Sequence, residues 1–292
     1  MASNVARRRL LILGGSGYVG QNVCHAAIKS GDFEIVRSLS RSGMPPTLLN
    51  SASSPHHHRL AQSLSSVEWT SGDVLDESFP LGDVMSDVDA VVSCIGAFGS
   101  NAHMQRVCGD ATIAAIRCAV LEKEKKGGEG GGEGEGEGKG VSAFGFVSSA
   151  RVYDGSLALR LPECVPMSGY FGGKHRAEEE LIRSFPAGHV ILRPGFVYGP
   201  RTVGGGRITV PLQWIGGPIS YVGTRLGPVS SFLGSLPLVG EEISSMVPVE
   251  SVARAMVESI VAVLDGAKKK EGGGIGAILD AESIRKFRYE EL

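Results

Sequence analysis

The chain has 292 residues, of which 42% are hydrophobic and 21% are charged, and its formal net charge at pH 7 is −2. That apolar fraction suffices for one sizeable core, so we expect a single domain over residues 1–292. The nearly neutral charge provides no basic field that would attract nucleic acid. We expect no transmembrane segment, because no apolar run approaches the ~20 residues that a membrane-spanning helix needs. The five cysteines lack Cys-x-x-Cys spacing, which favours free thiols over a disulfide framework and predicts no metal site.

The first predicted unit is a strand, a glycine turn and a helix. The apolar run at residues 10–13 is typical of a buried strand, and three glycines then follow at a spacing of three. In such a turn the glycines allow a tight bend, close approach of the backbone to a pyrophosphate, and packing of helix on strand. The N-terminus of the helix adds N–H groups that attract phosphate. The turn therefore predicts dinucleotide binding by Gly14, Gly17, Tyr18, Val19 and Gly20.

The residues after the second predicted strand, 34–39, bear on the choice of cofactor. In this kind of fold an acidic residue about 20 positions beyond the glycines binds the ribose of NAD, whereas an arginine accommodates the phosphate of NADP. The chain has Ser40 and Arg41 there and no acid. We therefore predict NADP as the cofactor and NAD as the alternative, although a solvated Arg41 would explain the residue as well.

Later strands are predicted at residues 67–70, 90–95, 144–147, 190–192 and 275–279. Helices are predicted at residues 104–122, from residue 170, and within 246–264. This alternation predicts the α/β class, a doubly wound parallel sheet (Rossmann fold) with helices on both faces. Asp73 follows the third strand, where such folds place a side chain beside the adenine, but a helix N-cap is an equal alternative. Gly96 follows the fourth strand and would let the backbone approach the cofactor.

Three segments are predicted to lie outside this regular pattern. Residues 42–66 are rich in Ser, Pro and His, which indicates a loop around a short helix, with His56–His58 in solvent. Residues 122–140 contain only Gly, Glu and Lys, so we expect a disordered insertion. The apolar stretch 201–245 is broken by Gly and Pro and predicts an irregular substrate cap over the carboxyl ends of the strands.

A tyrosine and a lysine four residues apart open the helix predicted from residue 170. This spacing places Tyr170 and Lys174 on one helical face, and a neighbouring ammonium favours the ionised phenol. Tyr170 is then a usable proton donor or acceptor, while Ser149, after the fifth strand, is placed to hydrogen-bond the reacting oxygen. We predict these three as the catalytic residues. The alternative is a relic of such a site in a protein that only binds the cofactor.

Four motifs carry a resemblance to a known family: the glycines of residues 14–20, VSSA at 147–150, YFGGK at 170–174 and RPGFVYG at 193–199. Together they resemble the extended and atypical branches of the short-chain dehydrogenase/reductase superfamily, which bind NAD(P) on a Rossmann fold. The resemblance implies that Lys174 also holds the cofactor ribose. It further implies that Pro194 and Val197 contact the cofactor.

Longer stretches are similar to one atypical group, namely SLSRSG at 38–43, SCIGAFGSN at 93–101, SGYFGGK at 168–174 and LRPGFVYG at 192–199. That group includes organellar proteins of mitochondria and plastids, among them one associated with ubiquinone biosynthesis. It is more distantly related to the nucleotide-binding accessory subunit of respiratory complex I. Within these motifs, Gly172 and Gly173 are expected to weaken the start of their helix.

Two functions of different class follow from the residues and the resemblance. The first is an NADP-dependent oxidoreductase that acts on a lipophilic carbonyl or quinone-like substrate, because apolar residues crowd the cap. The second is a nucleotide-binding accessory or assembly protein of an organellar membrane complex, without turnover. A sugar-nucleotide epimerase is a weaker third reading, since the cap offers only Arg201, Arg207 and Arg225 to a diphosphate.

The expected partners are a small lipophilic substrate or a membrane complex. Peripheral membrane association is compatible with such an apolar cap. Three arginines without an acid in residues 1–9 resemble an organellar presequence. We therefore expect a mitochondrial location, with plastid or cytoplasm as the alternatives.

Overall fold

The computed structural model describes residues 8–45, 48, 55–129, 140–150, 167–203, 208–211, 246–268 and 276–287. Within these ranges the centre of the molecule is a seven-stranded sheet in the order β11-β6-β5-β4-β1-β2-β3. All its neighbouring strands pair in parallel. Its strands are β1 (Arg9–Leu13), β2 (Ile35–Ser40), β3 (Glu68–Ser71), β4 (Ala90–Ser93), β5 (Ala143–Val147), β6 (His189–Arg193) and β11 (Ala277–Asp280). This order and direction confirm the predicted doubly wound fold.

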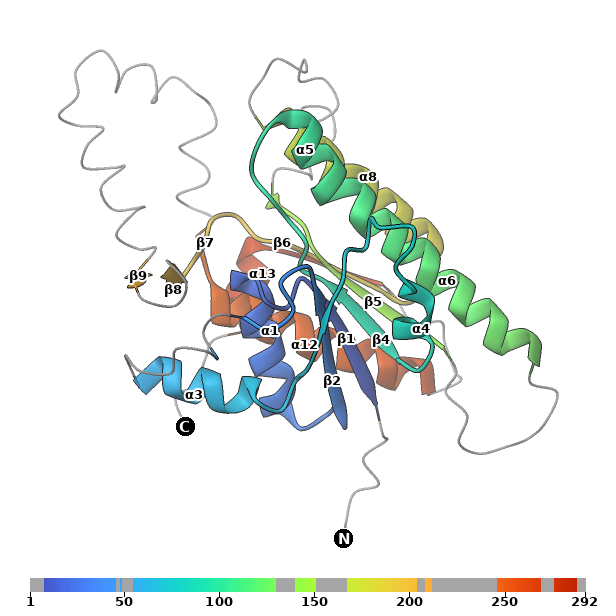
Figure 1. The fold of residues 1–292 in the computed structure, drawn as a ribbon, viewed down its shortest axis with the longest axis horizontal. Helices are drawn as coiled ribbons and strands as arrows, with labels where there is room; N and C mark the ends of the chain where they lie inside the picture. The colour runs from blue at the N-terminus through green and yellow to red at the C-terminus, as the bar shows by residue number, and fades with distance from the viewer. Residues whose placement is uncertain are drawn as a thin grey trace, which may run out of the picture.

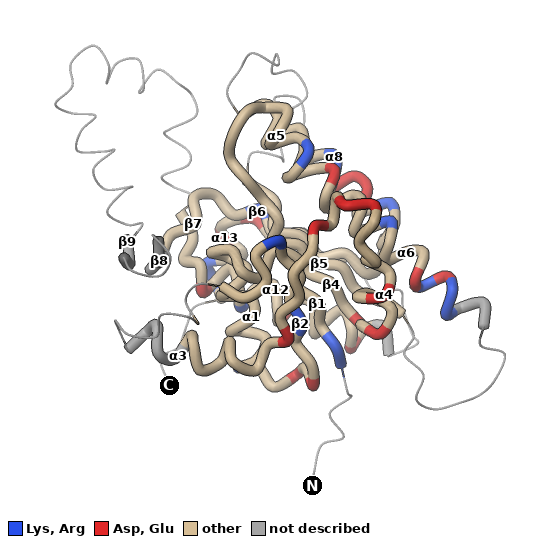
Figure 2. Tube along the Cα trace, viewed as in Figure 1, with Lys and Arg blue, Asp and Glu red and all other residues tan. Residues whose placement is uncertain are grey.

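Helices cover both faces of the sheet, as Figure 1 shows. One face packs against α1 (Tyr18–Ser30), α3 (Pro55–Leu64), α12 (Val249–Lys268) and α13 (Ala281–Arg285). The other face packs against α4 (Leu81–Met85), α6 (Ala111–Glu129) and α8 (Ser168–Ser184). Because both faces are covered, the central strands β4 and β5 are buried at every residue. They accordingly carry no charged side chain, and Figure 2 shows charge gathered on the outer helices instead.

A π-helical turn joins two helices on the second face. The helix α5 (Asn101–Gln105) leads through the π-helix Arg106–Asp110 into α6. The three form one rod alongside α8 (Figure 1). The predicted helix over 104–122 is therefore confirmed but begins earlier and ends later.

The predicted disorder of residues 122–140 is wrong for its first part. Helix α6 continues to Glu129, because Glu and Lys are good helix formers and Glu122 is buried. Glu122 accepts a hydrogen bond from Lys125, one turn further along. Residues 130–139 lie outside the described residues.

The cap segment is described only at its start. There β8 (Pro200–Val203) pairs antiparallel with β9 (Ile208–Pro211), so the chain begins the cap as a hairpin, in keeping with its β-branched residues. Residues 212–245 lie outside the described residues, as do the side chains of Arg201, Arg207 and Arg225. A short parallel pair, β7 (Val197–Tyr198) and β10 (Val247–Pro248), brackets the cap.

Several smaller expectations can be placed on this fold. A short helix within residues 42–66 is confirmed as α3, which contains His56–His58, whose side chains lie outside the described residues. Four of the cysteines are described, and all four are free thiols. Within the described ranges, no helix has both the length and the apolar character needed to cross a membrane.

Candidate dinucleotide-binding and active site

The glycine turn between β1 and α1 has the geometry that the sequence predicts. Gly14 has φ +78°, and a Cβ at that position would lie 3.2 Å from the backbone carbon and oxygen of Cys94. A Cβ at Gly20 would lie 2.2 Å from the carbonyl oxygen of Gly14. Side chains are therefore excluded at both positions, and the backbone is packed against the end of β4.

The start of α1 suits a phosphate group. Gly17 is the N-cap, and the first turn of the helix contains no acidic residue. The positive end of the helix dipole therefore faces the turn without a competing carboxylate. Tyr18, Val19 and Gly20 form this first turn. The glycine cradle and the helix end together fit a dinucleotide pyrophosphate.

A pocket of about 540 Å³ opens beside this turn, along the carboxyl ends of β1, β2, β3 and β4. Six of the predicted cofactor-binding residues line it, namely Gly14, Gly17, Ser40, Arg41, Asp73 and Gly96. The other lining residues were not predicted to bind the cofactor: Ser16, Leu39, Ser42, Gly72, Val74, Leu75, Cys94, Ile95, Val107 and Ala111. Five of them lie within the glycine turn or the recognised stretches 38–43 and 93–101, and this position was the signal that could have identified them.

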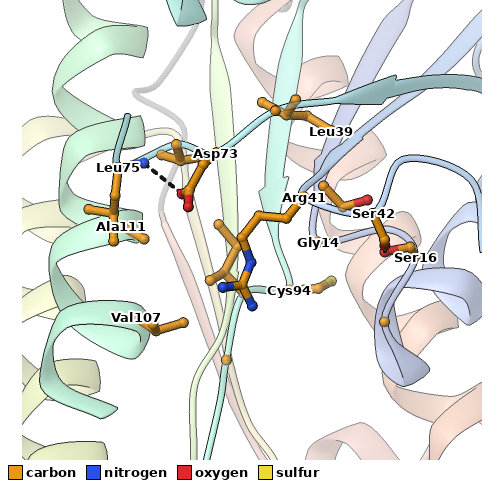
Figure 3. A pocket seen from close by; sticks show the side chains of 16 residues that line it. Gly14, Ser16, Leu39, Arg41, Ser42, Asp73, Leu75, Cys94, Val107 and Ala111 are labelled. Carbon is orange, nitrogen blue, oxygen red and sulfur yellow. Dashed lines mark hydrogen bonds between the residues drawn. The ribbon is translucent and has the colours of Figure 1, made fainter. Parts of the chain in front are cut away.

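Arg41 extends its guanidinium into this pocket, as Figure 3 shows. Two side-chain hydrogen bonds help to hold the turn that carries it, since Ser71 donates to the Arg41 carbonyl at 2.9 Å and Ser40 donates to the Gly43 carbonyl at 2.9 Å. The hydroxyl oxygens of Ser42 and Ser16 lie 2.8 Å apart and link this turn to the glycine turn. Arg41, Ser42 and Ser16 all line the pocket.

Asp73 also lines the pocket, and its carboxylate accepts a hydrogen bond from the Leu75 backbone N–H at 3.0 Å (Figure 3). The alternative role as a helix N-cap is wrong, because the next helix, α4, begins at Leu81 with Pro80 as its N-cap. Asp73 instead closes a local turn and presents its side chain to the pocket.

The predicted catalytic pair lies at the carboxyl end of β5. Lys174 is 3% exposed, and its Nζ donates to the carbonyl oxygen of Val147 at 2.6 Å. The same Nζ lies 5.2 Å from the centre of the Tyr170 ring and 4.9 Å from that of Phe146. Val147 ends β5, and half-buried Ser149 follows two residues later. Helix α8 therefore brings Tyr170 and Lys174 to the strand end that carries Ser149.

A buried ion pair fixes α8 against β6. The Nε of Arg193 lies 3.2 and 3.1 Å from the two carboxylate oxygens of Glu178, and the side chains are 13% and 3% exposed. Glu178 lies one turn beyond Lys174 on the same helix. The loop after β6 is tied to β5 as well, since the Ala150 N–H donates to the Pro194 carbonyl at 2.8 Å.

The glycines of α8 have a packing role that the sequence did not reveal. A Cβ at Gly169 would lie 2.0 Å from the Asn101 carbonyl oxygen, and one at Gly173 would lie 3.1 Å from that of Gln105. These residues, one turn apart, let α8 approach α5 and the π-helix closely. A Cβ at Gly172 meets nothing within 4 Å, so the expected weakening of the helix applies there without compensation.

An aromatic neighbour of Tyr170 was also missed. The Phe98 ring stacks on the Tyr170 ring with centroids 5.6 Å apart and planes 12° apart. Phe171 meets the same ring edge-on at 5.3 Å. The available signal for Phe98 was an apolar residue between two glycines directly after an apolar strand.

Pro194 and Val197 lie between β6 and the cap. Pro194 is buried, whereas Val197 is half-buried in β7 and packs against the core. Neither lines the pocket beside Arg41. Their contact with the cofactor stays a prediction from the resemblance.

This sheet order, the glycine turn and the pocket at the strand ends define a protein with a Rossmann dinucleotide-binding fold. The chain belongs to the NAD dependent epimerase/dehydratase family, whose model matches residues 10–212. It is thus a nucleotide-binding protein of the short-chain dehydrogenase/reductase type. An uncharacterised chloroplast protein of Arabidopsis thaliana is 33% identical over 260 residues, which cover 89% of this chain and 74% of the relative.

Solved structures share the fold at low sequence identity. A UDP-glucuronic acid 4-epimerase from Bacillus cereus in complex with NAD is 17% identical, with a TM-score of 0.53 over 93% of this chain and 76% of that one. A putative NAD-dependent epimerase/dehydratase from Bacillus halodurans is 17% identical, with a TM-score of 0.54 over 96% and 97% of the two chains. An oxidoreductase of the short-chain dehydrogenase/reductase family from Burkholderia thailandensis is 16% identical, with a TM-score of 0.52 over 94% and 92%.

Proposed function

We propose that the protein is an NADP-dependent oxidoreductase that acts on a lipophilic carbonyl or quinone-like substrate. The observation that carries the proposal is the arrangement of Lys174 and Tyr170 at the end of β5, beside Ser149. The Lys174 ammonium is buried, is held by the Val147 carbonyl oxygen and lies 5.2 Å from the centre of the Tyr170 ring. This places a fixed positive charge beside the phenol that would exchange a proton with the substrate.

The chemistry follows from these three side chains. When bound, the nicotinamide would supply or accept the hydride at the carbonyl carbon. Tyr170 would give its hydroxyl proton to the carbonyl oxygen during reduction and take it back in the reverse direction. The Lys174 ammonium lies 5.2 Å from the centre of the Tyr170 ring, and its hydrogen bond to the Val147 carbonyl keeps it in place. Ser149 would hold the carbonyl oxygen.

Turnover is tested with NADPH and a series of lipophilic aldehydes and quinones, followed by loss of NADPH absorbance. Tyr170→Phe should lower kcat by about 100-fold or more, because a positioned proton donor contributes at least that factor. Its affinity for the nucleotide should be unchanged, since Tyr170 does not line the pocket beside Arg41. Absence of turnover in the wild type, with the nucleotide tightly bound, would favour the non-catalytic accessory or assembly protein of an organellar membrane complex.

The preference for NADP over NAD is supported by Arg41, whose guanidinium enters the pocket, and by the hydroxyls of Ser16 and Ser42, which also line it. A guanidinium and hydroxyl groups recognise a phosphate, whereas a ribose hydroxyl is usually bound by an acid. NADPH should therefore bind more tightly than NADH in a fluorescence titration, and Arg41→Asp should remove the difference. Equal affinities in the wild type would contradict this preference.

The lipophilic substrate class and the membrane partner rest on the apolar composition of residues 208–240. Flotation of the protein with liposomes, together with activity on lipophilic quinones, is the expected result. Activity confined to small polar aldehydes, without flotation, would contradict this class. UDP-sugars belong in the same screen, because the epimerase reading predicts NADPH-independent conversion of a sugar nucleotide.

A plastid location is supported by the name of the relative from Arabidopsis thaliana. We propose the plastid in place of the expected mitochondrion, for which that relative offers no support. Immunodetection in purified plastids and mitochondria of the source organism tests this choice. Enrichment in mitochondria would restore the original expectation.

A further inference from the structure

The ring of Tyr170, the proposed proton donor, has a partner on each side. The Phe98 ring stacks on it with centroids 5.6 Å apart and planes 12° apart, and Phe98 is 75% exposed. The Lys174 Nζ lies over the same ring at 5.2 Å from its centre, and Lys174 is only 3% exposed. Because the ammonium approaches from the interior and the Phe98 ring from the solvent side, the Tyr170 ring lies between them.

A third contact limits the movement of the same ring. Phe171 meets Tyr170 nearly at right angles, with centroids 5.3 Å apart and planes 88° apart. The torsion next to an aromatic ring has broad minima, so the orientation of a tyrosine ring depends on its neighbours. Here Lys174 is fixed by its hydrogen bond to the Val147 carbonyl oxygen, and Phe98 supplies the contact on the solvent side.

The backbone on either side of Phe98 is anchored, although the residue itself lies in a loop that leads into α5 (Figure 1). The Ala97 N–H donates to the Cys108 sulfur at 3.4 Å, and the Cys108 thiol donates to the Ala97 carbonyl at 3.4 Å. Ser100 caps α5 by accepting from the His103 N–H at 3.3 Å. The exposed Phe98 ring is therefore presented to Tyr170 from a fixed stretch of chain.

The plane of a phenol ring sets the direction of its hydroxyl proton. The O–H bond lies in that plane because an oxygen lone pair is conjugated with the ring, so rotation of the ring turns the proton away from an acceptor. Proton transfer needs the correct direction as well as the correct distance between donor and acceptor. A neighbour that fixes the ring plane of Tyr170 therefore acts on the chemical step.

We propose that Phe98 is a positioning residue, whose ring holds the plane of the Tyr170 phenol and thereby sets the direction in which Tyr170 donates its proton. This inference rests on the proposed oxidoreductase function and adds to it a residue that acts through Tyr170. Substitution of Phe98 should lower kcat, whereas KM for NADPH should stay unchanged because Phe98 does not line the pocket beside Arg41.

The test measures NADPH oxidation with decanal and menadione as probes. Phe98→Leu keeps an apolar side chain but removes the flat ring, so kcat should fall about 2- to 10-fold, the factor to which the energy of an aromatic pair corresponds. Phe98→Tyr should restore the wild-type kcat. In the Tyr170→Phe background, Phe98→Leu should cause no further loss, since the hydroxyl is already absent. Leu121→Ala is the control, because Leu121 is an exposed apolar residue on α6, outside the site.

Two kinetic results would overturn the positioning role. An unchanged kcat in Phe98→Leu would show that the ring only covers Tyr170. A loss that persists in the Tyr170→Phe background, or a matching rise in KM for NADPH, would show that Phe98 supports the fold or the nucleotide instead.

An NMR measurement separates these results from failure of the oxidoreductase function. In protein with isotope-labelled tyrosine, the ring current of Phe98 should shift the Tyr170 signal. Phe98→Leu should therefore move this signal more than that of any other tyrosine, and Phe98→Tyr should largely preserve it. If the signal moves as expected but the wild type reduces neither probe, Phe98 holds the ring and the proposed reaction is refuted. An unmoved signal would refute the stacking contact itself, whatever the turnover.

Discussion

Two neighbouring glycines of α8 provide a direct test of how this helix is packed. In Gly172→Ala the new methyl group meets nothing within 4 Å, whereas in Gly173→Ala it lies 3.1 Å from the Gln105 carbonyl oxygen and the Gly109 nitrogen. Both changes gain the same helix propensity, about 0.5–1 kcal/mol. The difference between the two variants therefore isolates the contact of α8 with the π-helix.

The expected magnitudes follow from these distances. Gly172→Ala should stabilise the protein by about 0.5–1 kcal/mol and raise Tm by about 2 °C. Gly173→Ala should lose about 1–3 kcal/mol to overpacking, which cancels or exceeds its gain in propensity. Gly169→Ala is the extreme member of the series, because its methyl would lie 2.0 Å from the Asn101 carbonyl oxygen.

Equilibrium unfolding in urea, followed by far-ultraviolet circular dichroism, measures these differences. The urea midpoint should be highest for Gly172→Ala, then decrease through wild type and Gly173→Ala to Gly169→Ala, and all four proteins should have equal m-values. Equal stabilisation in Gly172→Ala and Gly173→Ala would refute the reasoning, since α8 and the π-helix would then not be in close contact.

Three further changes test other parts of the structure. Glu178→Gln should destabilise the fold by about 3 kcal/mol, because the buried Arg193 guanidinium loses the Glu178 carboxylate. The same urea assay measures this loss, and a much smaller value would contradict a structural role for the ion pair. Burial raises the pKa of the Cys94 thiol to about 12 and that of the Cys24 thiol well above 9.0. Because only the thiolate reacts with iodoacetamide, alkylation of Cys94 at pH 8.5 should be on the order of 1000-fold slower in the folded than in the unfolded protein. Because the folded pKa is raised, this thiol also favours folding at lower pH and ceases to do so as the pH rises from about 9 toward 12. Deletion of residues 130–138 should leave Tm unchanged, since these residues are only Gly and Glu, and a large fall in Tm would show that they pack.

The sequence by itself determined the elements and the nucleotide end of the site, because these depend on local patterns. The apolar run followed by glycines predicts β1, the turn and α1, and Gly14 lies in that turn. Arg41 was found from its position directly after β2, and both residues line the pocket in the structure. The predicted boundary at residue 122 failed because a helix segment without apolar residues has no periodic signal. The helix continues because Glu and Lys are good helix formers and because Glu122 is buried.

Only the tertiary structure decided how helix α8 is held and what covers Tyr170. The contact of Gly173 with the π-helix and the stacking of Phe98 on Tyr170 each join residues that are far apart in the chain. Spacing within one segment carries no information on such pairs, because they form only when the sheet sets the positions of its loops and helices. Within its own segment, Gly173 is therefore expected only to weaken its helix. In the structure, its missing side chain allows α8 to pack closely on the π-helix, and this packing places Tyr170 and Lys174 where the proposed chemistry needs them.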